Sequence, residues 1–471
     1  MIHLSVDQGQ LVTGLISEHG MQGMWFLWSG LIVVFVIPIV FAPLWKNLNF
    51  ITDNQFILFR FHGKESKFLH VFRAIYVGGL VVGLAISFHV LGFSRIIESI
   101  FNIKSEYAIL FSGLVLCFFA LRNVLDLKLK MDALNAFIYI LSFAIIGFYC
   151  FKTVGNFDNV FQYFERFPEK KEILPNASDS VSWFSIIVFT GIQWWSSNLF
   201  DGGGPEMARF TAVKNKRSAI LAGLTPIAIF FILSFILLFQ VLVILGLSSK
   251  EAVGEIHYVN GVFEIVPEAF KGLILIGFFT MFITSCESLM NWGASFLTID
   301  VFQNYLAPDS SAKRIRSISF LTMVFICLMA TFFAFSVNSL QGLIKITFSI
   351  AAGVAPVYIL RWIWYRINAW SQISAMVSSG VFTLLYPYIH NHTPFVNYPF
   401  EESRLVVVTF LTTFVWVLVT FLTKDKSERT RSVMRENVNS PQWILKRLAL
   451  SLLLGIVLMG ITVAVWWYLL G

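Results

Sequence analysis

Long apolar runs separated by short polar loops dominate the hydrophobicity pattern of this chain. A helix needs about 20 consecutive apolar residues to cross the hydrocarbon core of a bilayer. Runs of this kind predict about twelve full transmembrane helices, at residues 22–44, 69–96, 105–123, 133–154, 181–199, 217–247, 268–299, 316–338, 341–362, 371–389, 402–424 and 446–470. The runs lack the strict alternation of a membrane β-barrel, so the pattern predicts an all-α polytopic membrane protein.

The amino-acid composition agrees with this interpretation. Hydrophobic residues make up 57% of the 471 positions and charged residues only 13%, whereas soluble domains carry about 25% charged residues. So few charges cannot cover the surface of a soluble chain, which excludes a secreted globular protein and a disordered chain. We expect a multi-pass protein of the cell membrane, surrounded by the lipid bilayer.

The 34 basic residues are distributed unevenly among the loops. About two thirds of them lie in alternate loops, at 46–67, 122–130, 209–217, 313–316, 361–366 and 424–447. Cytoplasmic loops of membrane proteins carry an excess of Lys and Arg, so we predict that this set of loops faces the cytoplasm. The net charge of +7 therefore reflects membrane topology, and we expect no nucleic-acid partner.

Polar residues inside a predicted span are costly in lipid and indicate a partner or a function. In the span 268–299 they form one helix face, made by Thr280, Thr284, Ser288, Asn291 and Ser295. The adjacent hydroxyls of Thr284 and Ser285 could supply oxygen ligands to a small hard cation such as Na⁺. Hydrogen bonds to their own helix or to a neighbouring helix are the alternative, and the spacing leaves both open. Glu287 also needs a partner, for which Lys345 is a candidate.

Two further segments combine polar and apolar residues. Two interpretations are open for residues 4–14. They form a broken helix whose free carbonyls line a cavity, or they are a frayed terminus outside the membrane. Gln193, Trp194 and Trp195 either stack against a polar ligand or belong to an interfacial aromatic belt. The glycine run at 201–205 lacks the GK[ST] sequence of a phosphate loop, and the histidines form no HExxH pair. Neither a nucleotide site nor a metalloenzyme is therefore expected.

Five short motifs, in order along the chain, resemble those of the sodium:solute symporter family. They are Thr52-Asp53 through Arg60-Phe61-His62-Gly63; Asp132-Ala133-Leu134-Asn135; Glu206-Met207-Ala208-Arg209-Phe210 with Lys214; Thr284 to Asn291 followed by Asp300; and the segment Arg361 to Trp370. The resemblance covers essentially the whole chain. It implies a LeuT-type bundle of two inverted five-helix repeats, with ligand sites near the midplane where the first helix of each repeat is broken.

The resemblance also implies a division of the chain. We expect a single membrane transport domain over residues 1–471. Its first repeat would be 1–154, its second repeat 181–362, and its additional C-terminal helices 371–471. Matching the motifs places residue 1 near the middle of the broken first helix, so an N-terminal half-helix precedes the full spans. Either this sequence is a piece of a longer protein, or the protein is natively truncated.

Site residues follow from the same resemblance. Sodium would be held by the hydroxyls of Thr284 and Ser285 and by the carbonyls of Met281, Met1 and Leu4. Candidate substrate contacts are Asp7, Gln8, Gln193, Trp194 and Trp195. Apart from Na⁺ as the coupling ion, we expect neither a metal nor a cofactor.

The function that the resemblance implies is Na⁺-coupled symport of a small polar organic solute into the cytoplasm by alternating access, and not an enzymatic activity. Asp7 and Gln8 match positions that meet substrate in sugar-transporting members, which favours a sugar-like solute. The alternative is a transport-deficient membrane sensor that retains the symporter fold.

Overall fold

The computed structural model describes residues 5–122, 128–196, 201–251, 253–337, 339–424, 427–438 and 440–470. The described chain is helical and contains no strand. Its α-helices are α1 (Gln8–His19), α2 (Trp25–Trp28), α3 (Ala42–Leu48), α4 (Gln55–Arg60), α5 (Lys64–Ile75), α6 (Val82–Phe101), α7 (Ser105–Arg122), α8 (Lys128–Val154), α9 (Gln162–Arg166), α10 (Ser180–Val188), α11 (Trp194–Ser196), α12 (Pro205–Ala212), α13 (Lys216–Leu247), α14 (His257–Ile265), α15 (Glu268–Ser295), α16 (Ala312–Ser336), α17 (Leu340–Leu360), α18 (Ala369–Asn391), α19 (Phe400–Leu422), α20 (Ser427–Asn437) and α21 (Pro441–Leu470). Short 3-10 or π segments connect or interrupt them: η1 (Gly20–Met24), η2 (Ser29–Ile32), η3 (Ile37–Phe41), η4 (Tyr76–Val81), η5 (Phe157–Phe161), η6 (Pro168–Lys170), η7 (Phe189–Gln193), η8 (Phe296–Leu306) and η9 (Pro394–Asn397).

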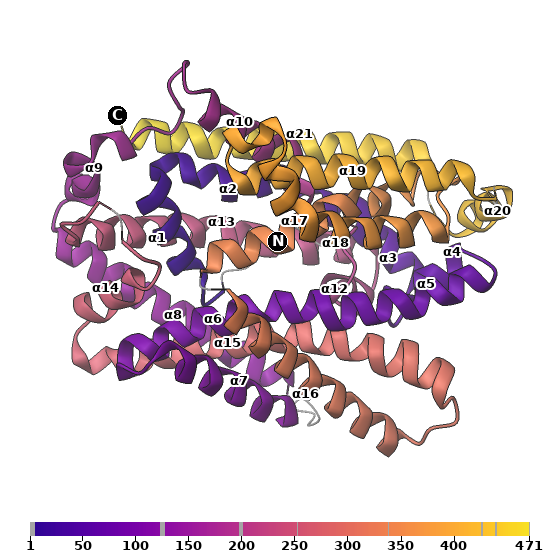
Figure 1. Ribbon diagram of the computed structural model, residues 1–471. Helices are drawn as coiled ribbons and strands as arrows, with labels where there is room; N and C mark the ends of the chain where they lie inside the picture. The colour runs from indigo at the N-terminus through magenta and orange to yellow at the C-terminus, as the bar shows by residue number, and fades with distance from the viewer. Residues whose placement is uncertain are drawn as a thin grey trace.

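The long helices run side by side and form one elongated bundle (Figure 1). In its described part, 9 helical stretches are long and apolar enough to cross a membrane. Within the described residues, each predicted apolar run falls largely on helical structure, and several runs are divided; residues 181–196, for example, are divided among α10, η7 and α11. The helices α4 and α20 and the start of α16, all in the basic set of loops, lie toward the right-hand end in Figure 1, opposite α9 and α14. We call this end the basic end.

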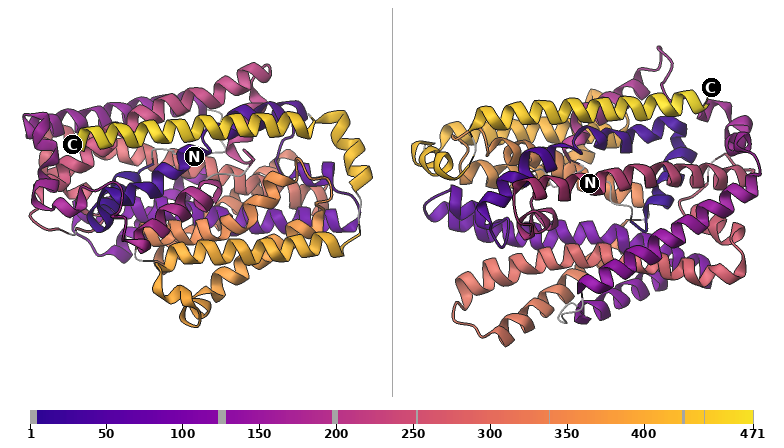
Figure 2. Two further views of the ribbon diagram at one scale, coloured as in Figure 1. Left: turned by 90° about the horizontal axis from the view of Figure 1, so that it is seen from above. Right: turned by 180° about the vertical axis from the view of Figure 1, so that it is seen from behind.

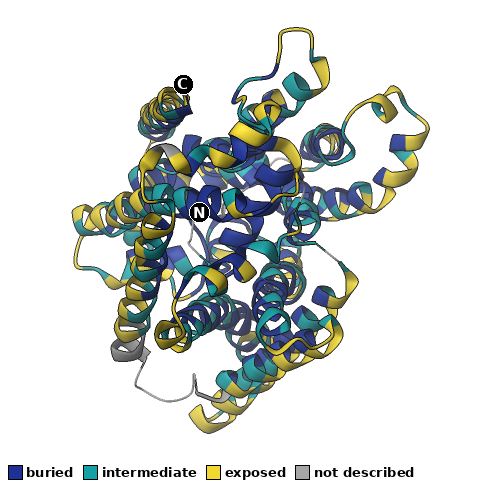
Figure 3. Cartoon of the chain, turned by 90° about the vertical axis from the view of Figure 1, so that its left-hand side faces the viewer, coloured by how far each residue is buried: buried dark blue, intermediate teal, exposed yellow. Residues whose placement is uncertain are grey.

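Large apolar side chains point outward from the bundle. Viewed along the helices, buried residues fill the centre and exposed residues cover the periphery (Figure 3). Phe332, Leu384 and Phe414 are examples, each more than half exposed. A soluble protein would not expose so much apolar surface, whereas lipid tails solvate it. The chain is therefore a multi-pass membrane protein.

The first helix, α1, is buried at the centre although its sequence is partly polar. It packs against α13, α14 and α17. Glycines make this packing tight: a Cβ at Gly9 would lie 2.2 Å from Cε1 of Tyr258, and one at Gly14 would lie 2.9 Å from Nε2 of Gln341. The burial of α1 argues against a frayed terminus outside the membrane, because the described residues 5–14 lie inside the bundle. That free carbonyls of this segment line a cavity stays a prediction.

Several of the spans are interrupted and not continuous α-helices. The span Gln8–Leu48 passes through η1, η2 and η3, and Lys64–Phe101 passes through η4. Pro38 lies within η3, and the pair Gly78-Gly79 lies within η4. Proline, glycine pairs and π segments are the ordinary causes of such breaks. The breaks bend the inner helices around a central space.

The C-terminal helix α21 runs along one side of the bundle (Figure 2). It packs against η2 and η3 of the span Gln8–Leu48. Gly455 makes the closest approach, because a Cβ there would lie 2.1 Å from the carbonyl oxygen of Ile32. Further along, the ring of Trp466 stacks on Phe235 of α13 at 5.6 Å. The helix thus covers the side of the bundle between the span Gln8–Leu48 and α13.

Candidate functional site

A cavity of about 800 Å³ lies inside the bundle. Side chains of α1, α6, α8, α13, α15, α17 and α21 line it, and most of the lining is apolar. The polar lining residues away from the basic end include Ser5, Asp7, Gln8, His89, Asn135, Tyr139, Thr280, Thr284, Ser285, Ser288, Thr347 and Thr462. A mostly apolar cavity of this size with a few polar groups is typical of a site for a small organic ligand.

At the start of α1, Asp7 is joined to α6. Its Oδ1 atom lies 2.7 Å from Nδ1 of His89, and both side chains are buried. Gly92 allows this approach, since a Cβ there would lie 2.6 Å from the Cβ of Asp7. Gln10 adds a second link by donating from Nε2 to the carbonyl of Gly92 at 2.8 Å. These contacts fix the position of the α1 N-terminus against α6.

The hydroxyl-bearing face of α15 forms another part of the cavity wall. Thr280 and Ser288 donate to carbonyls of their own helix, at Gly277 and Thr284, as the alternative interpretation of this face proposes. The hydroxyl of Thr284 accepts a hydrogen bond of 3.3 Å from Nδ2 of Asn135 on α8. Although they make these hydrogen bonds, Thr280, Thr284 and Ser288 all line the cavity.

The structure brings together the described residues of the predicted sodium site and two of the substrate candidates. Met281, Thr284 and Ser285 line the same cavity as Asp7 and Gln8. Met1 and Leu4, the other predicted sodium ligands, lie outside the described residues. The sodium-ligand and substrate assignments stay predictions, because the cavity shows only where these residues lie.

The other three substrate candidates do not line the cavity. Gln193 is buried and donates from Nε2 to the carbonyl of Phe26 at 2.6 Å. Trp195 donates from Nε1 to the carbonyl of Ala352 at 3.2 Å, and its ring packs edge-on against Trp194. In this arrangement the three side chains hold η7 and α11 against neighbouring helices, and their contact with substrate stays a prediction.

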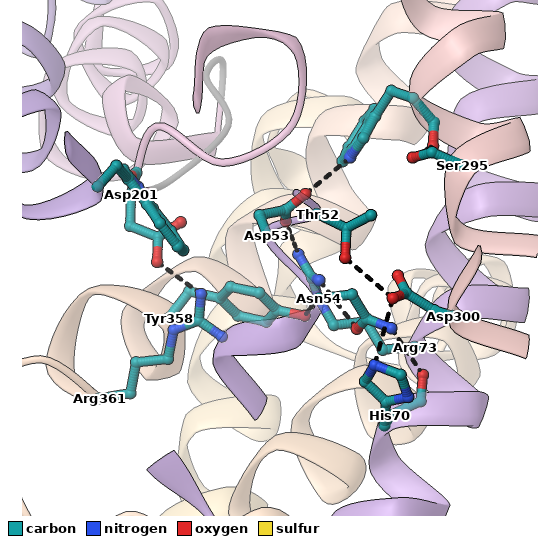
Figure 4. A network of polar contacts seen from close by, with 12 residues as sticks. Thr52, Asp53, Asn54, His70, Arg73, Asp201, Ser295, Asp300, Tyr358 and Arg361 are labelled. Atoms are coloured by element: carbon teal, nitrogen blue, oxygen red, sulfur yellow. Dashed lines mark hydrogen bonds and ion pairs between the residues drawn. The ribbon is translucent and has the colours of Figure 1, made fainter. Parts of the chain in front are cut away.

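A buried polar network, shown in Figure 4, lies where the cavity approaches the basic end. Its first centre is Arg73, which donates to Oδ2 of Asp53 at 2.5 Å, to Asn54 at 3.1 Å and to the hydroxyl of Tyr358 at 2.7 Å. Trp292 donates to the other carboxylate oxygen of Asp53 at 2.9 Å. The contacts join α5, the α3–α4 loop, α15 and α17.

The second centre of the network is Asp201. Its Oδ2 atom accepts hydrogen bonds from Arg361 at 2.6 Å and from the indole of Trp362 at 2.7 Å. Its carbonyl accepts a third from the indole of Trp45 at 2.6 Å. Arg361 also lies over the ring of Tyr358, 4.4 Å from its centroid, so the two centres touch.

Two further contacts extend the network. Asp300, within η8, accepts a hydrogen bond of 2.9 Å from Thr52 and lies 3.5 Å from His70. Arg60 donates to three carbonyls that follow α17, those of Arg361, Trp364 and Ile367. A cation at these carbonyls stabilises the negative end of the helix. The network thus ties helix ends from both predicted repeats together beneath the cavity.

At the opposite end of the bundle, Glu255 caps the start of α17. Its carboxylate accepts the backbone N–H groups of Leu340 and Gln341 at 3.0 and 3.2 Å. Burial raises the pKa of Glu255, and the two N–H donors partly oppose this rise. Lys345, the candidate partner of Glu287, lies 4.0 Å from Glu402 on α19.

The sequence interpretation assigned no role to the centres of these networks. Arg73 and His89 carried a usable signal, since both are titratable residues within the predicted span 69–96. Asp53, Asp300 and Arg361 belong to the recognised motifs, but their partners lie far away in the sequence. Only the folded chain shows which acid meets which base.

The comparisons with known proteins agree with one another. Residues 11–378 match the family model of the Sodium:solute symporter family. The Sodium/glucose cotransporter of Vibrio parahaemolyticus is 19% identical over 433 residues, which cover 84% of this chain and 77% of that protein.

Among solved structures, the substrate-bound outward-open state of a Na⁺-coupled sialic acid symporter matches with a TM-score of 0.59 at 13% identity. The match covers 90% of this chain and 91% of that one, and it shows that the two share the expected LeuT-type fold. The family match covers most of the sequence, and it identifies a transporter and not an enzyme. The chain therefore belongs to the sodium:solute symporter family.

Proposed function

We propose that this protein couples the entry of Na⁺ to the uptake of a small, neutral, hydroxylated solute such as a sugar into the cytoplasm. The observation that carries the proposal is the shared cavity. It is lined by Asp7 and Gln8 on one side and by Met281, Thr284 and Ser285 on another. An ion held by α15 would thus lie in the same space as a solute bound at the start of α1.

Coupling requires that Na⁺ bind one conformation more tightly than the other, since equal affinity shifts no equilibrium. An ion held between α1 and α15 meets this requirement when the two helices separate during the cycle. The α1 N-terminus is held by side-chain contacts of Asp7 and Gln10 with α6. Such contacts can be broken and remade without disturbing the helix itself.

The charges around the cavity favour a neutral solute over an anionic one. Among its described lining residues the basic ones are Arg73 and Arg209, and both pair with carboxylates, of Asp53 and Glu206. Near the start of α1 the carboxylate of Asp7 lines the wall. A carboxylate-bearing solute would meet this negative charge, whereas sugar hydroxyls can donate hydrogen bonds to it. The similarity to a sodium/glucose cotransporter supports the same solute class.

Replacing both hydroxyls, in the double variant Thr284→Ala with Ser285→Ala, tests the proposal. Each lost oxygen ligand costs about 1 kcal/mol, so the Na⁺ concentration for half-maximal uptake should rise about tenfold or more. The measurement is uptake of a panel of radiolabelled sugars into proteoliposomes at graded Na⁺ concentrations.

The matched control is Thr153→Ala with Ser336→Ala. These hydroxyls are exposed and bond to their own helices, at Tyr149 and Phe332. The control should keep the wild-type sodium dependence. An unchanged sodium dependence in the Thr284/Ser285 variant would contradict the sodium site. Binding of Na⁺ without uptake of any solute in the panel would favour the sensor alternative.

A further inference from the structure

The Asp7–His89 pair is a titratable site that the predicted sodium ligands do not include. The side chains of Asp7 and His89 are 3% and 9% exposed, and both residues line the cavity. Nδ1 of His89 contacts Asp7, while Nε2 makes no hydrogen bond to a described residue. Of the histidines in the described ranges, His89 alone lines this cavity. An imidazole thus lies at a surface that water and ions can reach.

A histidine–carboxylate pair inside a membrane bundle is energetically costly, so its presence indicates a functional site. Histidine is the side chain whose charge changes most readily between about pH 5 and pH 8. The adjacent carboxylate of Asp7 provides the counter-charge for an imidazolium. The pair can therefore exist in two states without losing its hydrogen bond, one with a net charge of −1 and one with a net charge of zero.

We propose that the Asp7–His89 pair binds a proton from the cavity. The proton moves from a hydronium ion in the cavity to Nε2 of His89, releasing water, and Asp7 stays ionised beside the imidazolium. Proton binding removes the net negative charge at the start of α1. It also sets the charge that any other ligand in the cavity meets.

Proton binding and sodium binding should oppose each other, because two cations in one low-dielectric cavity repel. Linkage makes the effect reciprocal, so Na⁺ weakens proton binding by the same factor. This consequence rests on the proposed sodium-coupled function, whereas the proton site itself does not.

Other titratable groups on the helices packed around the pair contribute to its environment. They include Cys286 and Glu287 on α15, His257, Tyr258 and Glu264 on α14, Tyr139 on α8, Cys117 on α7, Cys327 on α16, Lys345 and Tyr358 on α17, and Arg95 and Glu98 further along α6. Arg95 pairs with Glu98, and Lys345 lies beside Glu402. Cys286 lies within electrostatic range of both Asp7 and Glu287.

Two measurements on the purified full chain test the proposal. The first follows the histidine ring signals of ¹⁵N-labelled protein by NMR from about pH 5 to about pH 8.5, with the His89 signal assigned by its loss in His89→Gln. The second measures binding of ²²Na⁺ over the same range. Glutamine can still donate a hydrogen bond to Asp7 but cannot take up a proton. The control is His257→Gln, because His257 lies outside the cavity lining, near the carbonyl of Ile244.

We expect the His89 signal to titrate within this range. The Na⁺ affinity of the wild type and of His257→Gln should fall roughly threefold to tenfold from high to low pH, and that of His89→Gln should stay constant. If His89→Gln does not fold, Asp7→Asn gives the test, because removing the counter-charge should move one histidine titration to lower pH.

A His89 signal that does not titrate would overturn the proton site. A pH dependence of Na⁺ binding that persists in His89→Gln would overturn the opposition between the two ions. Titration of His89 without Na⁺ binding at any pH would support the proton site while the proposed symport fails.

Discussion

The variant Arg73→Met should lose about 3–5 kcal/mol of stability and all uptake, because it leaves a buried carboxylate without its counter-charge. Arg73 is 4% exposed and Asp53 is 1% exposed. Without Arg73, Asp53 keeps only the indole of Trp292 among its side-chain hydrogen bonds within the described residues, and Asn54 and Tyr358 each lose a donor. Four segments that meet beneath the cavity would lose their common contact.

The measurement is the thermal unfolding midpoint of the purified protein in detergent, together with uptake in proteoliposomes. A matched control lies in the same span, Lys64–Phe101. Arg95→Met removes a partly exposed guanidinium that pairs with Glu98 at 3.0 Å, and such pairs contribute about 0–1 kcal/mol. The control should therefore melt close to the wild type.

Restoring the charge balance should restore part of the stability. The double variant Asp53→Asn with Arg73→Met removes both charges and should melt above Arg73→Met alone, since the isolated buried carboxylate is the main cost. If Arg73→Met and Arg95→Met melt at the same temperature, the network does not hold the helix ends together.

Much of the fold could be predicted from the sequence, because the bilayer imposes one requirement that composition records directly. Each span must satisfy its own backbone hydrogen bonds and present apolar side chains to lipid. The breaks were harder to predict. The run 181–199 reads as one helix, yet π segment η7 interrupts it before Trp194. Hydrophobicity does not record such a break, because the residues on both sides are equally apolar.

The candidate site was predictable only where its residues are close in sequence. Thr284 and Ser285 are adjacent in the sequence, so the sequence alone could pair them as candidate ligands of one ion. Asp7 and His89 are 82 residues apart, and Asp201 and Arg361 are 160 apart. Pairs of this kind depend on which helices pack together and on small residues such as Gly92, which set how closely they approach. The partner of Gln193 is equally distant in the sequence: its amide donates a hydrogen bond to the carbonyl of Phe26 and does not line the cavity.

The C-terminal helix α21 forms part of the cavity wall, and we expect its position there to depend on Gly455. Leu458, Thr462 and Trp466 of α21 line the cavity. A Cβ at Gly455 would lie 2.1 Å from the carbonyl oxygen of Ile32 and 2.7 Å from that of Leu31. Both contacts are with backbone, which cannot move aside as a flexible side chain can.

The variant Gly455→Val should therefore push α21 away from the span Gln8–Leu48, at a cost in the upper part of the roughly 1–3 kcal/mol range for overpacking. Gly460→Val is the matched control, because it lies on the same helix and a Cβ there meets nothing within 4 Å. We expect a lower unfolding midpoint and slower uptake for Gly455→Val, and wild-type values for Gly460→Val. Equal behaviour of the two variants would mean that α21 is a peripheral helix. A defect in Gly455→Val alone would show that transport depends on the contact between α21 and the span Gln8–Leu48.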